Sequence, residues 1–445
     1  MNAICYHSSC LSLITHHSLL ITEYSSLSTH HSVLSPQYSV LITFFWLIQF
    51  SWIIFFLWLL GGALTLIALA RHKALRPSND TRLCGRDAPR VSVLVPARNE
   101  EHRVLLKCVR SILAQDYGDF EVVAVNDRST DATGAMLRSL SAGDERLRVV
   151  EGAETPAGWL GKPFALHQAL EASRGSWVLA TDADIIFAPT AIRTAVAYAV
   201  EHGCDALTLV PHFDALSFWE RVFVPTWFWG SLILFPQKFA NSPKTSLAIG
   251  VGGFYLIRRA ALERVGGYGA VRAEVLDDLR MAEILKRSGA RTVAEYAPAL
   301  LSTRMYTNLS ELWESSAKNW FAILKFSLVY TFATLAWMFF VAVVPPTLAA
   351  ASALMIALGN ADESWRQLLV PTLSTWALFV SLHALVNRRC GVPARYALTA
   401  PLGWVLSCAV LVGSAYGVLT GRGLMWKGRK FYARGGVRPP RTPGG

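Results

Sequence analysis

The sequence predicts an α/β domain with a mostly parallel sheet and helices on both faces, flanked by transmembrane α-helices. Three observations support this fold class. Strand-like and helix-like segments alternate through residues 85–305, where charged residues occur at an ordinary density. Residues 41–70 contain no charge and exceed the roughly 20 residues that span a bilayer. Further long apolar runs follow at residues 327–359, 368–386 and 397–420.

The N-terminal part divides into a low-complexity segment, residues 1–40, and one transmembrane helix, residues 41–70. No Lys or Arg occurs before Arg71, but Lys73 and Arg76 follow at once. Because Lys and Arg next to a membrane span favour the cytoplasmic side, we expect the N-terminus outside and the domain at 85–305 in the cytoplasm. The formal net charge of +11 is explained by contact with anionic lipid, and no motif for nucleic-acid binding accompanies it.

Four strands are predicted in the first part of the domain, at 91–96, 120–125, 147–150 and 176–181. A segment with helical spacing of apolar residues follows each of the first three. In a parallel sheet built this way, ligands bind beyond the carboxyl ends of the strands. Polar residues from distant parts of the sequence are therefore expected to meet at one edge of the sheet.

Three groups of polar residues occupy those strand ends. Pro96, Arg98 and Glu100 follow the first strand, Asp127 follows the second, and Asp182 and Asp184 follow the fourth. Burying an unpaired carboxylate is costly, so the two aspartates predict a divalent cation such as Mg²⁺, which binds carboxylate oxygens and substrate phosphates. The alternative for Asp182 and Asp184 is a solvent-exposed turn.

Two further features lie later in the domain. Gly252 and Gly253 lie in a predicted Gly-rich strand and permit close approach of the backbone to a ligand. Asp277 and Asp278 lie at the N-terminal end of a predicted helix. One acid there is explained by the helix dipole, and the other is a candidate general base.

The C-terminal part contains an amphipathic interfacial helix at 306–326, a transmembrane bundle at 327–420 and a basic tail at 421–445. The alternative for 306–326 is the entry to the next span. If the chain makes two passes hinged at Pro345 and Pro346, the bundle has four spans and the tail lies inside; we favour this interpretation. If residues 327–359 instead form one kinked helix, the bundle has three spans and the tail lies outside.

These motifs resemble glycosyltransferase family 2, the inverting enzymes with the GT-A fold. The resemblance rests on VSVLVPARNEE, VAVNDRSTDAT, GWLGKPFALHQAL, ATDADIIF, VGGFYLIRRAALERVGGY, LDDLRMA and WKGRKFY. Within the family the chain is most similar to the membrane-bound hopene-associated glycosyltransferases, which are related to ceramide glucosyltransferases. The resemblance implies a bacterial inner-membrane protein with a cytoplasmic catalytic domain.

The resemblance also implies roles for individual residues. The catalytic base would be Asp278, the second acid of a pair that is Glu-Asp in the family. The metal, Mg or Mn, would be held by Asp184 with Asp182. The nucleotide-sugar would be bound by Pro96, Arg98, Glu100, Asp127, Lys162 and Asp182. The alternative for Lys162 is a solvated lysine at a helix start.

The resemblance implies that the protein transfers a sugar to the hydroxyl of a membrane lipid. We expect the donor to be a UDP-sugar, and the similarity to the hopene-associated enzymes implies a role in hopanoid biosynthesis. One alternative is a processive polysaccharide synthase. Such enzymes carry Q/R-x-x-R-W, whereas residues 316–320 read SAKNW, keeping Trp320 and offering only Lys318 as a basic substitute. The other alternative is a non-catalytic membrane protein that binds a nucleotide-sugar or a lipid.

Overall fold

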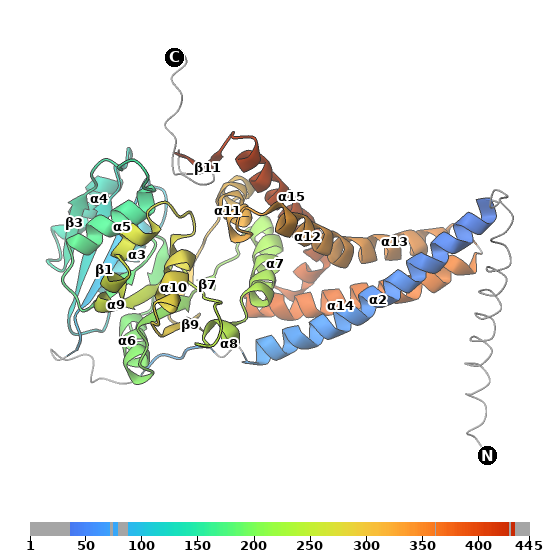
Figure 1. Cartoon of the computed structure of the whole chain (residues 1–445), viewed down its shortest axis with the longest axis horizontal. Coiled ribbons are helices and arrows are strands. Elements are labelled where there is room, and N and C mark those ends of the chain that lie inside the picture. Colours follow the sequence, from blue (N-terminus) through green and yellow to red (C-terminus); the bar gives the residue numbers. More distant parts are fainter. Residues whose placement is uncertain (1–35, 72–73, 79–87, 361, 427–428, 432–445) are drawn as a thin grey trace, which may run out of the picture.

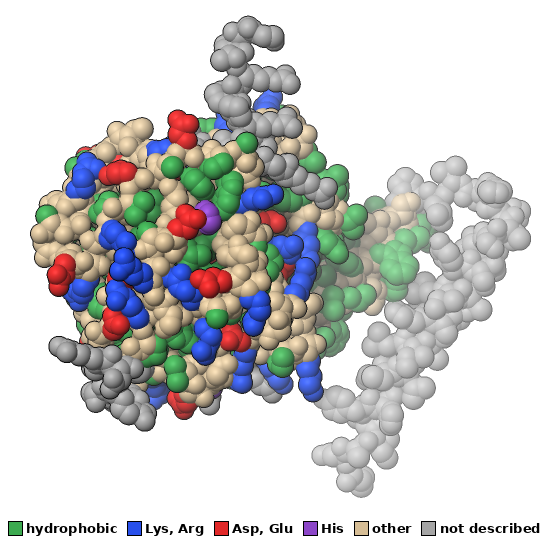
Figure 2. All heavy atoms as spheres, turned by 60° about the vertical axis from the view of Figure 1, so that its left-hand side comes forward, with side chains coloured by type: hydrophobic (Ala, Val, Ile, Leu, Met, Phe, Trp, Pro, Cys, Tyr) green, Lys and Arg blue, Asp and Glu red, His purple; other side chains and the backbone are tan. Residues whose placement is uncertain are grey.

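The computed structural model describes residues 36–71, 74–78, 88–360, 362–426 and 429–431. An α/β domain lies at one end, and long helices extend from it to the other end (Figure 1). Figure 2 shows Lys, Arg, Asp and Glu side chains mixed over the face of the domain, with hydrophobic side chains on the helices behind it. The predicted low-complexity segment lies almost wholly outside the described residues.

The main sheet has seven strands in the order β3-β2-β1-β4-β8-β6-β9. Neighbouring strands are parallel except where β8 pairs with β4 and with β6. The strands are β1 Val91–Ala97, β2 Phe120–Asn126, β3 Leu147–Glu151, β4 Trp177–Ala180, β6 Ala206–Val210, β8 Tyr255–Arg258 and β9 Thr292–Tyr296. The mostly parallel sheet with helices on both faces is confirmed.

The two faces of this sheet carry separate apolar layers. Val93 and Val95 point to one face, where they pack with α3, α4 and α6, and Leu94 points to the other, where it packs with α5, α9 and α10. Burial on both sides explains why the central strands are almost continuously apolar. The helices are α3 Leu105–Leu113, α4 Thr133–Ser141, α5 Gly161–Glu171, α6 Ala191–Glu201, α9 Arg259–Arg264 and α10 Asp277–Arg287, with a 3-10 helix, η3, at Gly267–Val271.

A second, three-stranded sheet leads from the domain towards the membrane helices. Its order is β5-β10-β7, with β5 Ile185–Phe187, β7 His212–Phe213 and β10 Leu301–Thr303. Helix α7, Phe218–Leu234, and the short α8, Gln237–Ala240, follow β7. Glu220 in the first turn of α7 is buried and accepts hydrogen bonds from Arg304 at 2.8 and 3.1 Å, which ties α7 to the end of β10.

Helix α7 belongs to the predicted cytoplasmic domain by sequence but packs against the membrane helices. Trp229 lies in one buried apolar cluster with Trp58, Phe379 and Trp404. These aromatic side chains come from α7, α2, α14 and α15, so the cluster joins the domain to the helical part.

Four helical stretches are long and apolar enough to cross a membrane: Tyr38–Ala70, Leu328–Ala357, Glu363–Arg389 and Ala394–Leu419. The helices that form them are α2 Pro36–Arg71, α12 Leu328–Met338, the π-helix η4 Phe339–Val343, α13 Val344–Ala357, α14 Glu363–Arg389, the 3-10 helix η5 Ala394–Thr399 and α15 Ala400–Leu419. The preference for two passes hinged at Pro345 is wrong, because residues 328–357 form one continuous stretch.

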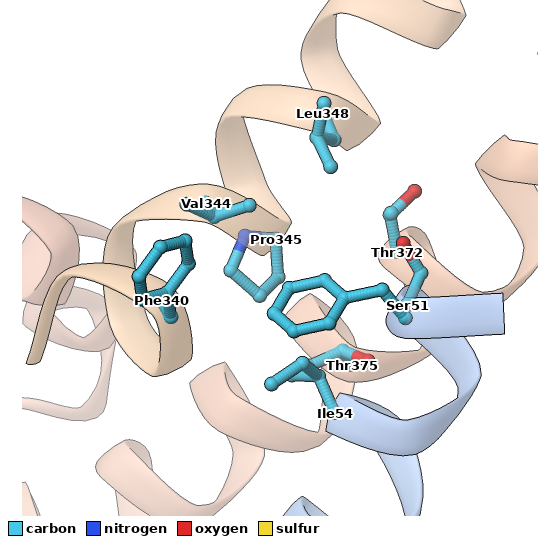
Figure 3. A pocket seen from close by; sticks show the side chains of 9 residues that line it. Ser51, Ile54, Phe340, Val344, Pro345, Leu348, Thr372 and Thr375 are labelled. Carbon is cyan, nitrogen blue, oxygen red and sulfur yellow. The ribbon is translucent and has the colours of Figure 1, made fainter. Parts of the chain in front are cut away.

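The wide π-helical turn explains how two prolines fit within that stretch. Pro345 and Pro346 take the first positions of α13, where a backbone N–H is not needed. A small pocket lined by Ile54, Phe340 and Thr375, among others, lies between η4, α2 and α14 beside this turn (Figure 3).

Between the domain and the spans lies α11, Leu309–Ile323, which corresponds to the predicted amphipathic helix. A two-stranded hairpin, β11 Leu424–Trp426 and β12 Arg429–Phe431, packs beside it.

Candidate active site

Hydrogen bonds join the loops after β1 and β2 at the carboxyl edge of the sheet. Asn99 and Arg128 both have φ of 51°, a left-handed conformation that is uncommon for residues with a side chain. Asn99 Oδ1 accepts from the N–H of Thr130 at 2.9 Å. The Arg98 guanidinium donates to the backbone carbonyl of Asp127 at 2.7 Å. Backbone strain held by such contacts is typical of functional loops.

Asp182, directly after β4, faces Lys162 in the first turn of α5. Lys162 Nζ lies 2.6 Å from Asp182 Oδ1. Burial alone would lower the pKa of Lys162, but the carboxylates of Asp182, Asp277 and Asp278 outweigh it and raise the pKa. Lys162 therefore carries a positive charge at the centre of three aspartates.

Asp184, two residues further on, lies in a second charged cluster around Arg103. Arg103 Nη2 is 3.2 Å from Asp184 Oδ2, and Arg103 Nε is 3.6 Å from Glu100 Oε2. Arg103 Nη1 also pairs with Glu311 in the first turn of α11. One guanidinium therefore links the strand-end acid to the helix that leads into the membrane part.

Asp277 and Asp278 begin α10 and reach the same place from the opposite side. Asp278 Oδ2 accepts from the backbone N–H of Gly252 at 2.6 Å, and its Oδ1 accepts from the N–H of Leu279 at 2.8 Å. Asp277 is buried, and burial raises its pKa; the positive charge of Lys162 opposes this, and the Asp278 carboxylate adds to it. A raised pKa suits a carboxylate that exchanges protons near neutral pH.

Gly252 lies where these groups meet. A Cβ added there would be 2.6 Å from Lys162 Nζ, 3.1 Å from Asp182 Oδ2 and 3.3 Å from Asp278 Oδ2. The absence of a side chain at Gly252 therefore leaves a space that is bordered by one lysine and two aspartates, where the backbone can approach a ligand closely, as the sequence predicts.

A pocket opens at this point and includes two tyrosines. Lys162, Gly252 and Asp277 line it together with Tyr255 and Tyr268. Both tyrosine hydroxyls are buried, and among the described residues neither has a hydrogen-bond partner. A buried hydroxyl without a partner is costly, so these two favour a polar ligand in the pocket.

Lys318 of α11 adds a second cation. Burial and the charge of Lys162 lower its pKa to about 8, although the carboxylates of Asp277, Asp182 and Asp278 partly offset them. The site therefore holds two lysines close to three aspartates. The lysines can stabilise an anionic diphosphate, and an aspartate can accept a proton.

The structure thus brings Lys162, Asp182 and Asp278 together around Gly252, and connects Glu100 with Asp184 through Arg103. Pro96 ends β1, and Arg98 and Asp127 lie in the adjoining loops. Sequence reasoning missed Arg103 and Glu311, which no quoted motif contains, and it gave no role to Tyr255 and Tyr268, although both lie in the motif VGGFYLIRRAALERVGGY. It noticed Lys318 only as a basic residue near Trp320.

The donor atoms at the strand ends suit a hard divalent cation. Among the residues that the structure describes, no group of three or more His, Cys, Asp or Glu side chains could hold a metal by itself. Mg²⁺, however, is commonly bound through one or two carboxylates together with substrate phosphates. Asp182 and Asp184 supply carboxylates of that kind.

Comparison with known proteins shows what the domain is similar to. Residues 92–266 match the family model described as Glycosyl transferase family 2. A beta-monoglucosyldiacylglycerol synthase from Synechocystis sp. is 32% identical over 231 residues, which cover 49% of this chain and 46% of that protein. An N-acetylglucosaminyltransferase from Azorhizobium caulinodans is 39% identical over 100 residues, 22% of this chain and 24% of that protein. The chain thus spans about half or less of these relatives.

One solved structure that matches the chain is a mannosyltransferase from Pyrobaculum calidifontis in complex with GDP-Man and Mn²⁺. It is 19% identical, with a TM-score of 0.44, and the match covers 83% of this chain and 98% of that one.

Proposed function

We propose that this chain, which carries a glycosyltransferase family 2 domain over residues 92–266, moves a sugar from a nucleotide-sugar to the hydroxyl of a membrane lipid with inversion. The observation that carries the proposal is the meeting of Lys162, Asp182 and Asp278 around Gly252. This cluster lies beside α11, which connects the domain to the membrane helices. Donor chemistry and access from the bilayer thus come together.

In this proposal Asp278 is the general base. The N–H groups of Gly252 and Leu279 hold its carboxylate in a fixed orientation. When the acceptor hydroxyl attacks the anomeric carbon, its proton passes to Asp278, and the bond from that carbon to the diphosphate breaks on the opposite face. Asp277 tunes the charge next to it.

The cations serve the leaving group. Lys162 and Lys318 lie close enough to the three aspartates to influence their charge, and both can stabilise negative charge developing on the diphosphate. Asp184 with Asp182 would hold Mg²⁺ or Mn²⁺, which supplies Lewis-acid stabilisation of the same charge. Pro96, Arg98, Glu100 and Asp127 form the nucleotide side of the site.

The acceptor is the part of the proposal that most needs a direct test. Several relatives are named beta-monoglucosyldiacylglycerol synthases, which favours diacylglycerol as the first acceptor to offer. The similarity to hopene-associated enzymes makes a hopanoid alcohol the second. UDP-sugars are the first donors to offer. We place the protein in a bacterial inner membrane with the domain in the cytoplasm.

The test uses the full-length protein in lipid nanodiscs. Radiolabelled UDP-glucose is supplied with diacylglycerol or a hopanoid alcohol, and the lipid product is identified by mass spectrometry and its anomeric configuration by NMR. A β-linked glycolipid from an α-linked donor would support the proposal. A labelled polymer instead of a single-sugar lipid would favour a processive synthase. Binding of UDP-sugar without any product, across a panel of lipid acceptors, would favour a non-catalytic binding protein.

A further inference from the structure

Helix α15 differs in direction from the other apolar helices. Figure 1 shows α2, α13 and α14 running beside one another away from the domain, whereas α15 lies across their direction, close to the domain. It packs most extensively against α11 and α7, and also against η4, α12 and η5. By length and composition α15 could cross a membrane, but its placement is that of a helix lying along the membrane surface.

Both halves of α15 are fastened to helices on the domain side. A Cβ at Gly403 would be 2.6 Å from the backbone of α7, and one at Gly413 would be 2.7 Å from the ring of Trp313 in α11. Ser414 Oγ accepts from the N–H of Phe321 in α11 at 3.1 Å. These contacts along the length of α15 hold it against the helices on the domain side.

The distribution of charge gives an independent argument. From residue 388 to residue 445 the chain has ten Lys and Arg and no Asp or Glu. Arg388, Arg389 and Arg395 precede α15, and the other seven follow it. If α15 crossed the membrane, these two groups would lie on opposite sides, against the usual asymmetry of basic residues. If α15 does not cross, all ten lie on the side of the domain, as Arg71 does at the end of α2.

The outer face of α15 matches the interior of a bilayer. Leu402, Val405, Val412, Tyr416 and Leu419 are all exposed, and their spacing places them along one side of the helix. The opposite side is covered by α7 and α11. A helix with an apolar outer face and protein on its aqueous side is suited to lie just below the lipid headgroups.

We infer that α15 lies in the plane of the membrane on the side of the catalytic domain, with its exposed stripe against the acyl chains of that leaflet. The chain then crosses the bilayer three times, through α2, through α12 with α13, and through α14. Its basic tail lies on the same side as the domain. The inference does not depend on the proposed reaction.

Cysteine labelling tests the side on which α15 ends. The seven native cysteines are replaced by alanine. Single cysteines are introduced as Arg422→Cys after α15, Glu201→Cys in the domain, and Glu363→Cys at the start of α14. A membrane-impermeant maleimide is applied to intact and to lysed spheroplasts. We expect Arg422→Cys to match Glu201→Cys and to differ from Glu363→Cys. Labelling of Arg422→Cys together with Glu363→Cys would overturn the inference.

An epitope tag after Gly445 of the wild-type chain gives the same answer without changing any cysteine. Trypsin added to intact spheroplasts is expected to leave this tag in place and to remove it after lysis. Removal of the tag from intact spheroplasts would refute the predicted side.

Depth measurements test the orientation itself. Spin labels at Leu402→Cys, Val412→Cys and Leu419→Cys are compared by their collision rates with oxygen and with a water-soluble nickel chelate. The outer two positions are about 25 Å apart along the helix axis, close to the hydrocarbon thickness of about 30 Å. A helix in the membrane plane gives one similar depth at all three positions. A maximum depth at Val412 with shallow values at both ends would show that α15 spans.

Discussion

Replacing Gly252 with alanine tests whether the space between Lys162, Asp182 and Asp278 is used by a ligand. The added Cβ would lie 2.6 Å from Lys162 Nζ, closer than the atoms tolerate. The amine is the far end of a flexible side chain, so it moves away from Asp182 and out of the pocket. The fold should survive, because Gly252 does not have a positive φ and the crowded atoms are not in the apolar core.

The size of the effect follows from the interaction that is lost. A hydrogen bond to a charged group contributes about 1.5–3 kcal/mol. Displacing Lys162 from a donor phosphate should therefore lower kcat/KM about 10- to 100-fold, since each 1.4 kcal/mol is a factor of ten. Crowding of the Asp278 carboxylate, 3.3 Å from the new methyl group, would add to this loss.

Gly253→Ala is the matched control. Its Cβ would meet only apolar atoms, Ile185 Cδ1 at 3.0 Å and Pro211 Cγ at 3.7 Å. This change should lower the free energy of unfolding by the cost of overpacking, about 1–3 kcal/mol, and leave kcat/KM nearly unchanged. Glycolipid formation and thermal unfolding are measured for both variants. If Gly252→Ala keeps wild-type kcat/KM, or if the two variants lose activity equally, the space beside Gly252 is not a ligand site.

The other predictions concern single roles. Asp278→Asn should lower kcat at least about a hundredfold while donor affinity, measured by calorimetry, is retained. If Asp277→Asn lowers kcat more than Asp278→Asn does, the base is Asp277. Asp184→Asn should raise the concentration of Mn²⁺ or Mg²⁺ needed for half-maximal activity, and full wild-type activity in chelator would exclude the metal. Because the pKa of Lys318 is lowered to about 8, its charge is present below that pH and lost above it. The value of kcat/KM should therefore fall as pH rises through about 8, and Lys318→Arg should remove this fall. Tyr268→Phe should raise KM for the donor without lowering the melting temperature, because the lost hydroxyl has no partner within the described protein; a lower melting temperature with unchanged KM would make the hydroxyl structural.

The sheet could be predicted because its signal is local. Strands β1, β2 and β4 are short apolar runs, and helix α3 repeats apolar residues at helical spacing from Leu105 to Ile112. The order of the later strands could not be predicted, since β8 enters between β4 and β6 in the antiparallel sense through contacts with no local sequence signal.

Asp182 and Asp184 were predictable for the same reason, since they follow a strand, and Asp277 and Asp278 were predictable because they begin a helix. Their partners were not. Arg103 reaches Asp184 across 81 residues, and Lys318 arrives from a helix more than 130 residues after Asp184. Pro345 and Pro346 misled the count of spans because the sequence gives no sign of the π-helical turn that accommodates them.

The position of α7 limits what can be cut from this protein. A fragment of residues 85–305, chosen by sequence as the soluble part, would include α7 but not α2, α14 or α15. Trp229, now almost fully buried, would then face water, because Trp58, Phe379 and Trp404, which cover it, belong to the missing helices. Such an exposed apolar patch promotes aggregation. Solubility trials should therefore start from the intact chain in detergent or nanodiscs, and a soluble fragment would need α7 redesigned with polar residues on its membrane-facing side.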